Sequence, residues 1–269
     1  EAGLVAVVEG GRVEDLDPPY SAYPAVPLEL ALYPENAVYA LGIRQVQPYS
    51  HWLFERWLTW STGDYYAIYF NDLVDAKQSG IVYEDKPRYG LFVPEESMPE
   101  GEVTLYGRVL RAGSFQESTS PLQTILVKTD RPGGIDQDPG SAWHSRLIMS
   151  IEGFPENSPI NQENSAGGVW CLIEPYPYIR KNDKIEFSWD GVIVTHIVSP
   201  EEAAGSGPVR IWVSKSVIDQ GGLHGKLTLR FRVQDVAENI SGEKYQYSQP
   251  YFLQSELDPS LSPAPFFLI

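Results

Sequence analysis

Apolar and polar residues alternate along many short stretches of the chain, with the two-residue period of β-strands. Residues 183–191 (DKIEFSWDG) place Ile185, Phe187 and Trp189 on one side of a strand, with polar and charged residues on the other. Residues 64–72 (DYYAIYFND) repeat this pattern. Both stretches run into Asn, Asp or Gly, at Asn71-Asp72 and Asp190-Gly191. These residues accept the backbone conformation of tight turns, so a hairpin is predicted after each strand.

Three stretches in the first half of the chain align with three in the second half, in the same order. Residues 15–36 lie over 136–157, and both contain Asp-x-Asp-Pro and Pro-Glu-Asn. The two strands above lie 119 residues apart (183 − 64), and residues 103–112 lie over 227–236 at a spacing of 124 (227 − 103). Ordered self-similarity of this kind indicates a tandem duplication, with small changes of length in the loops.

The predicted secondary structure is all-β. No segment shows a sustained helical stripe. The alternative, a short helix at 94–98 or 200–204, concerns single turns only. Short strands between Gly-, Pro-, Asn- and Asp-rich turns, in a unit of about 120 residues, are typical of a two-sheet sandwich. Trp170, Trp189 and Trp212 lie in strand patterns and are expected in the core.

Gly, Pro and Asp concentrate in residues 128–141 (KTDRPGGIDQDPGS), which predicts the connection between two domains. We assign residues 1–130 to a first sandwich with an inserted Trp-rich loop and residues 131–258 to a second. We assign residues 259–269 to a tail, which is a candidate for the start of a further repeat. The abrupt start at Glu1 and the apolar end PAPFFLI suggest a piece of a longer protein.

The chain is acidic, with 20 Lys and Arg against 36 Asp and Glu and a formal charge of −16. Such a chain repels a polyanion, which argues against nucleic acid as a partner. The charge fits a secreted or surface protein kept soluble by self-repulsion, or one that collects divalent cations. Cys171 is the only cysteine, so an intrachain disulfide is excluded. Neither a membrane-spanning apolar run nor a signal peptide is recognisable in these residues.

Paired aspartates at the two domain edges are candidate metal ligands. Asp15 and Asp17 precede the first repeat, and Asp136 and Asp138 precede the second. Carboxylate oxygens at a linker can bind Ca²⁺ and stiffen the joint, although a full site needs six to eight oxygens. The alternative is that Asp and Pro make a solvated turn.

Aromatic residues gather in the inserted stretch of the first repeat. Exposed rings on a sandwich can stack on sugar rings or on a partner protein, which makes this cluster a candidate ligand-binding surface. Its residues are Trp52, Trp57, Trp60, Tyr65 and Tyr66. The alternative is that these rings pack in the core or between domains.

No motif points to catalysis. The four histidines are scattered, and the chain has no HExxH, GxSxG, CxxC or phosphate-binding glycine loop. Carboxylates are so numerous that a pair at glycosidase spacing would be uninformative. Cys171 lies in an apolar run and is expected to be a buried small hydrophobe. We therefore predict no enzyme activity and no cofactor; a glycoside hydrolase is the less favoured alternative.

Four segments resemble the immunoglobulin-like repeat of very large, multi-repeat bacterial proteins of the adhesin type. They are KTDRPGG (128–134), DQDPGSAWH (136–144), EPYPYIRKNDKIEFSWDGV (174–192) and LRFRVQDVAENIS (229–241). The second copy matches nearly throughout. The first copy departs from the pattern, because Phe70-Asn71-Asp72 replaces Trp-Asp-Gly and Ala112-Gly113-Ser114 replaces the Asp-containing turn.

The resemblance implies two tandem immunoglobulin-like sandwiches that act as a structural or adhesive module, a spacer or display stalk, in a bacterial surface or secreted protein. It implies an extracellular or cell-surface location. Neighbouring repeats of the same chain would be its partners, with a glycan or a host or cell-surface protein as a further candidate. The alternative function is a carbohydrate- or protein-binding module that uses the aromatic loop 51–66.

Overall fold

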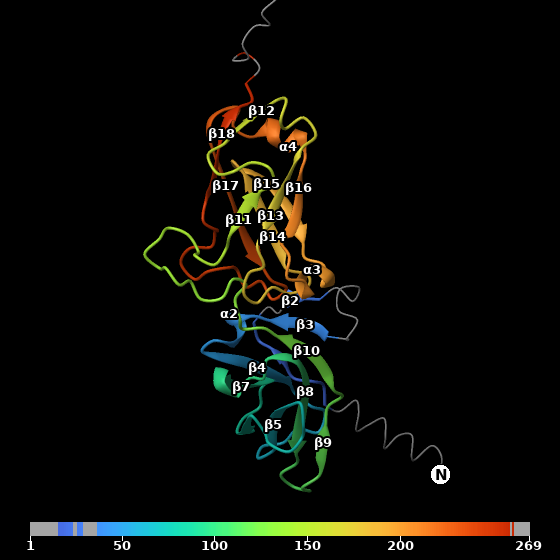
Figure 1. Cartoon of the computed structure of the whole chain (residues 1–269). Helices are drawn as coiled ribbons and strands as arrows, with labels where there is room; N and C mark the ends of the chain where they lie inside the picture. The colour runs from blue at the N-terminus through green and yellow to red at the C-terminus, as the bar shows by residue number, and fades with distance from the viewer. Residues whose placement is uncertain (1–15, 24–25, 29–36, 259, 261–269) are drawn as a thin grey trace, which may run out of the picture. The chain divides into compact units, whose positions relative to one another are not determined.

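The computed structural model describes residues 16–23, 26–28, 37–258 and 260. The chain divides into two compact units, Glu1–Thr129 and Asp130–Ile269, which are best followed by colour in Figure 1. Buried apolar side chains form two clusters, and each cluster draws all its members from a single unit. Each unit therefore closes its own core. Apart from Ser260, the predicted tail lies outside the described residues.

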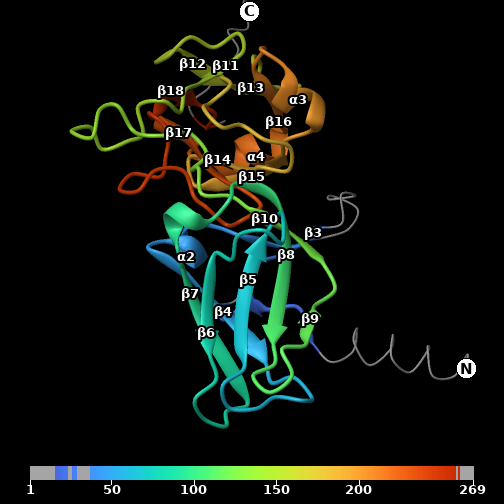
Figure 2. The same cartoon turned by 90° about the horizontal axis from the view of Figure 1, so that it is seen from below.

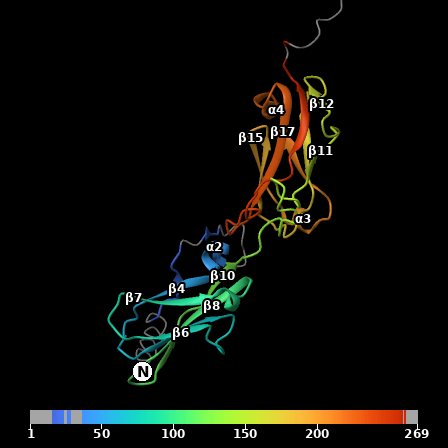
Figure 3. The same ribbon diagram turned by 90° about the vertical axis from the view of Figure 1, so that its left-hand side faces the viewer.

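Unit 2 is a sandwich of a three-stranded and a five-stranded sheet (Figure 3). The first sheet has the order β11-β13-β16, formed by Met149–Ile151, Val169–Ile173 and Val209–Val213. The second has the order β12-β18-β17-β14-β15, formed by Pro159–Asn161, Tyr251–Glu256, His224–Gln234, Lys184–Trp189 and Val192–Ile197. Neighbouring strands are antiparallel except β12 and β18, which are parallel.

Unit 1 has the corresponding strands in the corresponding order (Figure 2). Its smaller sheet is β1-β4-β7, formed by Tyr20–Ser21, Tyr49–Glu55 and Arg88–Pro94. Its larger sheet contains β3-β10-β8-β5-β6, formed by Ala37–Leu41, Gln123–Val127, Gly101–Leu110, Tyr65–Phe70 and Gln78–Ile81. Two short strands are additional, namely β2 (Val26–Pro27) beside β3 and β9 (Glu117–Thr119) beside β8. The pair β3 and β10 is parallel, as β12 and β18 are.

This topology is immunoglobulin-like and confirms the predicted all-β fold class. The chain crosses between two packed sheets, and the two sheets enclose the apolar side chains of both inner faces. In both units the larger sheet contains a parallel pair formed by an early strand and the last strand of the unit.

Strand register agrees with the sequence alignment of the two halves. Phe70 on β5 faces Leu105 on β8, and Trp189 on β14 faces Leu229 on β17. Phe70 and Trp189 are 119 residues apart, and Leu105 and Leu229 are 124 residues apart, which are the spacings found in the sequence. The two central strand pairs are therefore equivalent residue by residue. Common origin by duplication stays a prediction.

Burial follows the predicted alternation in unit 2. Ile185, Phe187 and Trp189 are fully buried on β14, and the apolar positions of β17 face the same core. In unit 1 the strand β5 is buried on both faces, because Ala67 and Tyr69 are covered as well. Its alternation of apolar and polar residues is accordingly weaker than that of β14.

The two predicted hairpins differ in their turns. Asp190 and Gly191 join β14 to β15 directly, with φ of 45° and 97°, as a two-residue turn with positive φ at both positions requires. Unit 1 also pairs β5 with β6, but the connection runs from residue 71 to 77. Asn71 begins it with a φ of 68°.

Short helices are present at both places where the sequence allowed one as an alternative. Helix α3 spans Pro200–Ala204, and a 3-10 turn spans Glu95–Ser97. Helix α3 begins where its sequence dictates, because Ser199 accepts the backbone N–H of Glu202 and the Glu202 side chain returns to the backbone of Ser199. Two further short helices, α2 (Ile43–Val46) and α4 (Lys215–Gln220), were not predicted.

Part of the predicted connection is built into unit 2. Pro132, Gly133 and Gly134 are buried, and the fully buried His144 donates from Nε2 to the carbonyl of Gly134 at 3.1 Å. Its Nδ1 accepts the backbone N–H of Arg146 at 3.1 Å, which leaves the proton on Nε2. The dense Gly and Pro content therefore marks a tightly packed entry into the second unit.

Candidate functional site

Three of the five aromatic candidates are buried and therefore inaccessible to a ligand. Trp52, Trp57 and Tyr66 expose 0%, 2% and 7% of their surface and belong to the core of unit 1. Trp52 occupies an inward position of β4, where alternate residues are buried. Core packing, the alternative given in the sequence analysis, describes these three side chains.

Trp60 and Tyr65 remain partly accessible. The guanidinium of Arg56 lies over the Trp60 ring at 5.2 Å from its centre. Arg56 also pairs with Asp85 at 2.6 Å and lines a surface depression together with Glu55, Asp85 and Pro87. Trp60, Tyr65 and this depression are therefore accessible parts of the predicted binding surface.

The carboxylate of Glu55 at this depression is held in its charged form. The hydroxyl of Tyr20 donates to it, and so does Arg88 at 2.6 Å, and these two hydrogen bonds lower the pKa of Glu55. A carboxylate whose proton affinity is lowered in this way is a poor general acid.

Each unit holds a buried aspartate bound to an aromatic side chain seven residues earlier. Trp57 Nε1 donates to Asp64 at 2.9 Å, and the hydroxyl of Tyr176 donates to Asp183 at 2.8 Å. Both aspartates also accept the backbone N–H three residues earlier, and both stand at the start of the equivalent strands β5 and β14. The shared spacing was present in the sequence, and it marks Trp57 as structural.

The exposed aromatic surface lies instead on the outer face of the smaller sheets. His51 on β4 faces Phe92 on β7, with ring centres 4.3 Å apart and nearly parallel planes. Trp170 on β13 faces Trp212 on β16, with ring centres 5.0 Å apart. The strands are equivalent, so both units carry a cross-strand aromatic pair there, and in unit 1 Tyr49 of β4 also contacts Phe92, with ring centres 5.1 Å apart.

The prediction of a core position was wrong for Trp212, which is 44% exposed, whereas Trp189 is fully buried. Trp170 is partly buried, and the guanidinium of Arg210 lies 4.3 Å from its ring centre. Arg210 also pairs with Glu152 at 2.9 Å. Sequence reasoning missed this pair because β13 carries apolar residues on both faces. On β16, Arg210 shares the outward face with Trp212 and was the signal that could have placed this ring.

The aspartates proposed as metal ligands lie at turns or outside the described residues. Asp15 is among the residues not described, and Asp17 is exposed. Asp136 accepts the backbone N–H of Asp138 at 3.0 Å and the hydroxyl of Ser145 at 2.7 Å. Burial opposes the charged form, but these hydrogen bonds prevail and lower the pKa of Asp136. Asp138 accepts the hydroxyl of Ser141 at 2.6 Å.

Within the described part of the chain, no three His, Cys, Asp or Glu side chains are grouped so that they could hold a metal ion. The Ca²⁺ site at the linkers therefore stays a prediction. Cys171 is buried, and burial raises the pKa of its thiol. That environment disfavours the thiolate that nucleophilic chemistry requires.

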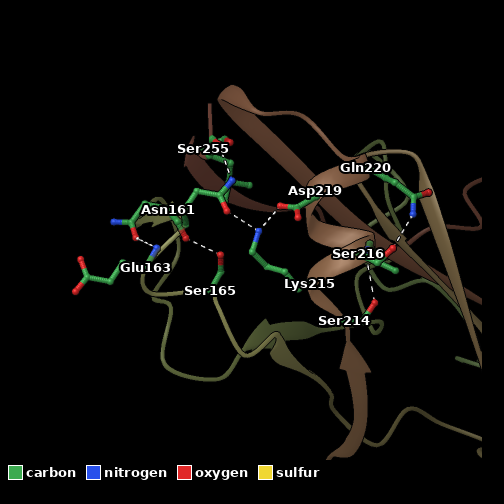
Figure 4. Close-up of polar contacts among 12 residues, drawn as sticks. Asn161, Glu163, Ser165, Ser214, Lys215, Ser216, Asp219, Gln220 and Ser255 are labelled. Atoms are coloured by element: carbon green, nitrogen blue, oxygen red, sulfur yellow. Dashed lines mark hydrogen bonds and ion pairs between the residues drawn. The ribbon is translucent and has the colours of Figure 1, made fainter. Parts of the chain in front are cut away.

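A polar cluster joins helix α4 to the loop that follows β12 (Figure 4). Lys215 contacts Asp219 one turn along the helix and donates to the side-chain oxygen of Gln162 at 2.6 Å. Gln162 in turn donates to the carbonyl of Leu257 at 2.7 Å. Ser214 caps the helix by accepting the N–H of Val217. These bonds connect helix α4 to the loop after β12 and to the end of β18, and they give the Lys215 ammonium two partners within the chain.

No helix among the described residues has the length and apolar character that crossing a membrane requires. No family model matches the sequence, and no curated protein matches it either.

Several solved structures are similar in fold. A structure of a 1.5-MDa bacterial ice-binding adhesin matches with 14% identity and a TM-score of 0.32, over 80% of this chain and 58% of that chain. The FN1-FN3 domains of chicken CNTN1 match with 11% identity and a TM-score of 0.34, over 78% and 59%. The D0-D1 domain of intimin matches with 8% identity and a TM-score of 0.23, over 80% and 94%. The chain thus spans less than two thirds of the first two structures.

These scores are low, so the fold assignment depends on the strand order, pairing and register of the chain itself. Those show two units with one immunoglobulin-like topology. The chain is a pair of immunoglobulin-like β-sandwich units, and its similarity to known proteins is a similarity of fold.

Proposed function

We propose that the chain is a non-catalytic structural and adhesive module, which serves as a spacer or display stalk in a larger bacterial surface or secreted protein. The observation that supports this proposal most directly is the parallel pairing of an early strand with the last strand of each unit's larger sheet. In unit 1, β3 pairs with β10, and in unit 2, β12 pairs with β18.

Parallel pairing of an early strand with the last strand suits a module that bears tension. When the two ends of a unit are pulled apart, the force acts along these strands, so their hydrogen bonds are loaded together. Antiparallel strands joined at a hairpin would instead open one bond at a time. Each unit has its own core, so each would unfold as a separate element.

Force spectroscopy on the full chain tests the mechanical part of this proposal. We expect two unfolding events, each releasing roughly 400 Å for about 120 residues at the extension limit of a polypeptide. The backbone N–H of Gln254 donates to the carbonyl of Ser158 at 2.9 Å, which links β18 to the start of β12. Gln254→Pro removes this donor and should lower the unfolding force of one unit only.

Gln254→Ala is the matched control, because it keeps the backbone N–H at an exposed side-chain position. An unchanged force for Gln254→Pro, or a single unfolding event for the wild-type chain, would contradict the proposal.

In the parent protein, replacing this segment with an unrelated pair of sandwiches should preserve a pure spacer role and abolish an adhesive one. Labelling intact cells with an antibody against the segment tests the surface location.

A second candidate function is a binding module for a glycan or a partner protein. The observation in its favour is the outward aromatic pair found at the same position in both units, His51 with Phe92 and Trp170 with Trp212. Phe92 and Trp212 are 51% and 44% exposed, and exposed rings of this size often mark contact surfaces. Binding to a glycan array that survives Trp170→Ala and Trp212→Ala together would remove the basis for this candidate.

A further inference from the structure

One outer face of this acidic chain is basic. On the larger sheet of unit 2, alternate residues of β17 point away from the core, and three of them are Lys226, Arg230 and Arg232. The inward residues between them are fully buried, so the three cations share the solvent-facing side. Lys184, on the neighbouring strand β14, adds a fourth.

Aromatic rings hold two of these cations in place. The guanidinium of Arg230 lies 3.8 Å from the centre of the Tyr247 ring, and the ammonium of Lys226 lies 3.6 Å from the centre of the Phe252 ring. Among the described residues, neither cation has a carboxylate within ion-pair distance. A guanidinium stacked on a ring keeps its N–H donors directed outward in its own plane, ready for a carboxylate or sulfate.

Arg232 and Lys184 differ from Arg230 and Lys226, because both already contact the carboxylate of Glu186. Arg232 donates to Glu186 at 2.6 Å, and Lys184 lies 3.4 Å from the same carboxylate. The hydrogen bond from Arg232 is the main cause of the lowered pKa of Glu186. Glu256 is the other acid at an outward position of the strands β14, β17 and β18. Four cations against two carboxylates leave the face positive, in a chain whose overall charge is −16.

The equivalent strand of unit 1 lacks these two cations. In the alignment supported by strand register, Glu102 stands at the position of Lys226, and Tyr106 stands at the position of Arg230. Arg108 corresponds to Arg232 and likewise lies over a tyrosine ring, that of Tyr69. The fold therefore requires neither Lys226 nor Arg230, and their presence distinguishes the second unit.

We propose that the outer face of β17 and β18 in unit 2 binds an anionic polysaccharide, with Lys226 and Arg230 as its two ionic contacts. Four residues along a strand place these cations about 13 Å apart. A chain with anionic groups at intervals can engage both, whereas a single charged sugar reaches only one. The half-buried rings of Tyr247 and Phe252 supply apolar surface beside each cation, which suits the C–H faces of sugar rings.

Charge density favours a polysaccharide over nucleic acid. Duplex DNA carries one charge per ~1.7 Å of its length, so the acidic remainder of this chain would repel it strongly. A polysaccharide with one carboxylate per sugar ring, such as polygalacturonate, has a lower charge density than duplex DNA and meets less repulsion. An acidic polypeptide offers the same charges without sugar faces, and its binding is one outcome of the test. The proposal does not depend on the spacer function, which its failure would leave intact.

The test uses the full chain with four probes, namely polygalacturonate for carboxylates, dextran sulfate for sulfates, neutral dextran and poly-glutamate. The variant Lys226→Glu with Arg230→Tyr installs the residues that unit 1 carries at the equivalent positions. Lys77→Glu with Arg146→Tyr changes the net charge equally and is the matched control, because neither residue belongs to a strand of this sheet. Lys226→Gln with Arg230→Gln is a milder second variant, and two retained melting transitions verify folding.

We expect calorimetric binding of the wild-type chain to one or both anionic polysaccharides, weakened by added salt, and none to neutral dextran. The face variant should lose about tenfold or more in affinity, while the control variant keeps it. Binding to polygalacturonate alone or to dextran sulfate alone supports the proposal and identifies the anionic group. Equal losses in both variants, equally tight binding of poly-glutamate, or no binding of either polysaccharide would each overturn it.

Discussion

The buried hydrogen bond between Tyr176 and Asp183 permits a quantitative prediction. The hydroxyl of Tyr176 donates to the carboxylate at 2.8 Å, and the two residues are 2% and 0% exposed. Burial, followed by the nearby Asp183, raises the pKa of Tyr176, so the hydroxyl keeps its proton at every pH at which the protein is handled. The hydroxyl of Tyr176 is therefore the donor of this bond.

Tyr176→Phe removes this donor and leaves the ring in place. A buried hydrogen bond to a charged group contributes about 1.5–3 kcal/mol to stability. For a unit of this size, 2 kcal/mol lowers the melting temperature by roughly 6–10 °C. With an m-value of about 2 kcal/mol per molar urea, the midpoint falls by about 1 M. Only the transition of unit 2 should move, because unit 1 closes a separate core.

Differential scanning calorimetry of the full chain measures both transitions. Hydrogen exchange on peptides from β14 and β17, compared with β5 and β8, assigns each transition to its unit. Tyr178→Phe is the matched control, because this tyrosine lies two residues away but is 48% exposed. Its hydroxyl has water as a partner in both states, so its loss should change stability by less than about 0.5 kcal/mol.

A double-mutant cycle tests the charge of the acceptor. In an Asp183→Asn background, the hydroxyl meets a neutral acceptor, so Tyr176→Phe should cost only about 0.5–1.5 kcal/mol. The reasoning fails if Tyr176→Phe alone costs as little as Tyr178→Phe. It also fails if Tyr176→Phe lowers both transitions together, because that would couple the two cores.

Three further predictions concern pH, metal and packing. Arg232 lowers the folded-state pKa of Glu186, so the stability that Glu186 contributes is present above its unfolded pKa of about 4.5 and is lost as the pH falls through the folded value. The stability difference between the wild-type chain and Glu186→Gln, followed by calorimetry from pH 6 to pH 3, should therefore shrink. If a linker binds Ca²⁺, the ion raises the melting temperature relative to chelator, and Asp136→Asn with Asp138→Asn abolishes the increase; equal curves favour the solvated turn. Trp189→Ala should cost about 3–5 kcal/mol by denaturant titration because it empties the core, whereas Trp212→Ala on the surface should cost less than about 1 kcal/mol, and similar costs would contradict the assigned burial.

The sequence by itself determined the fold class and the alignment of the two halves. Strand periodicity needs only local information, because successive side chains of a strand point to opposite faces. The alternation in residues 183–191 therefore identified β14 and its inward side chains, and the alignment of residues 103–112 with 227–236 marked β8 and β17 as equivalent. The start of α3 also has a local cause, because the structure shows Ser199 and Glu202 capping it reciprocally.

Tertiary structure alone decided which aromatic rings face solvent. Trp52 and His51 are adjacent in the sequence, yet one is fully buried and the other lies on the outer face beside Phe92. Trp170 and Trp212 look like core residues, and only the pairing of β13 with β16 brings them together outside the core. The orientation of a strand whose residues are apolar on both faces depends on which face the second sheet covers, and that is a property of the assembled sandwich.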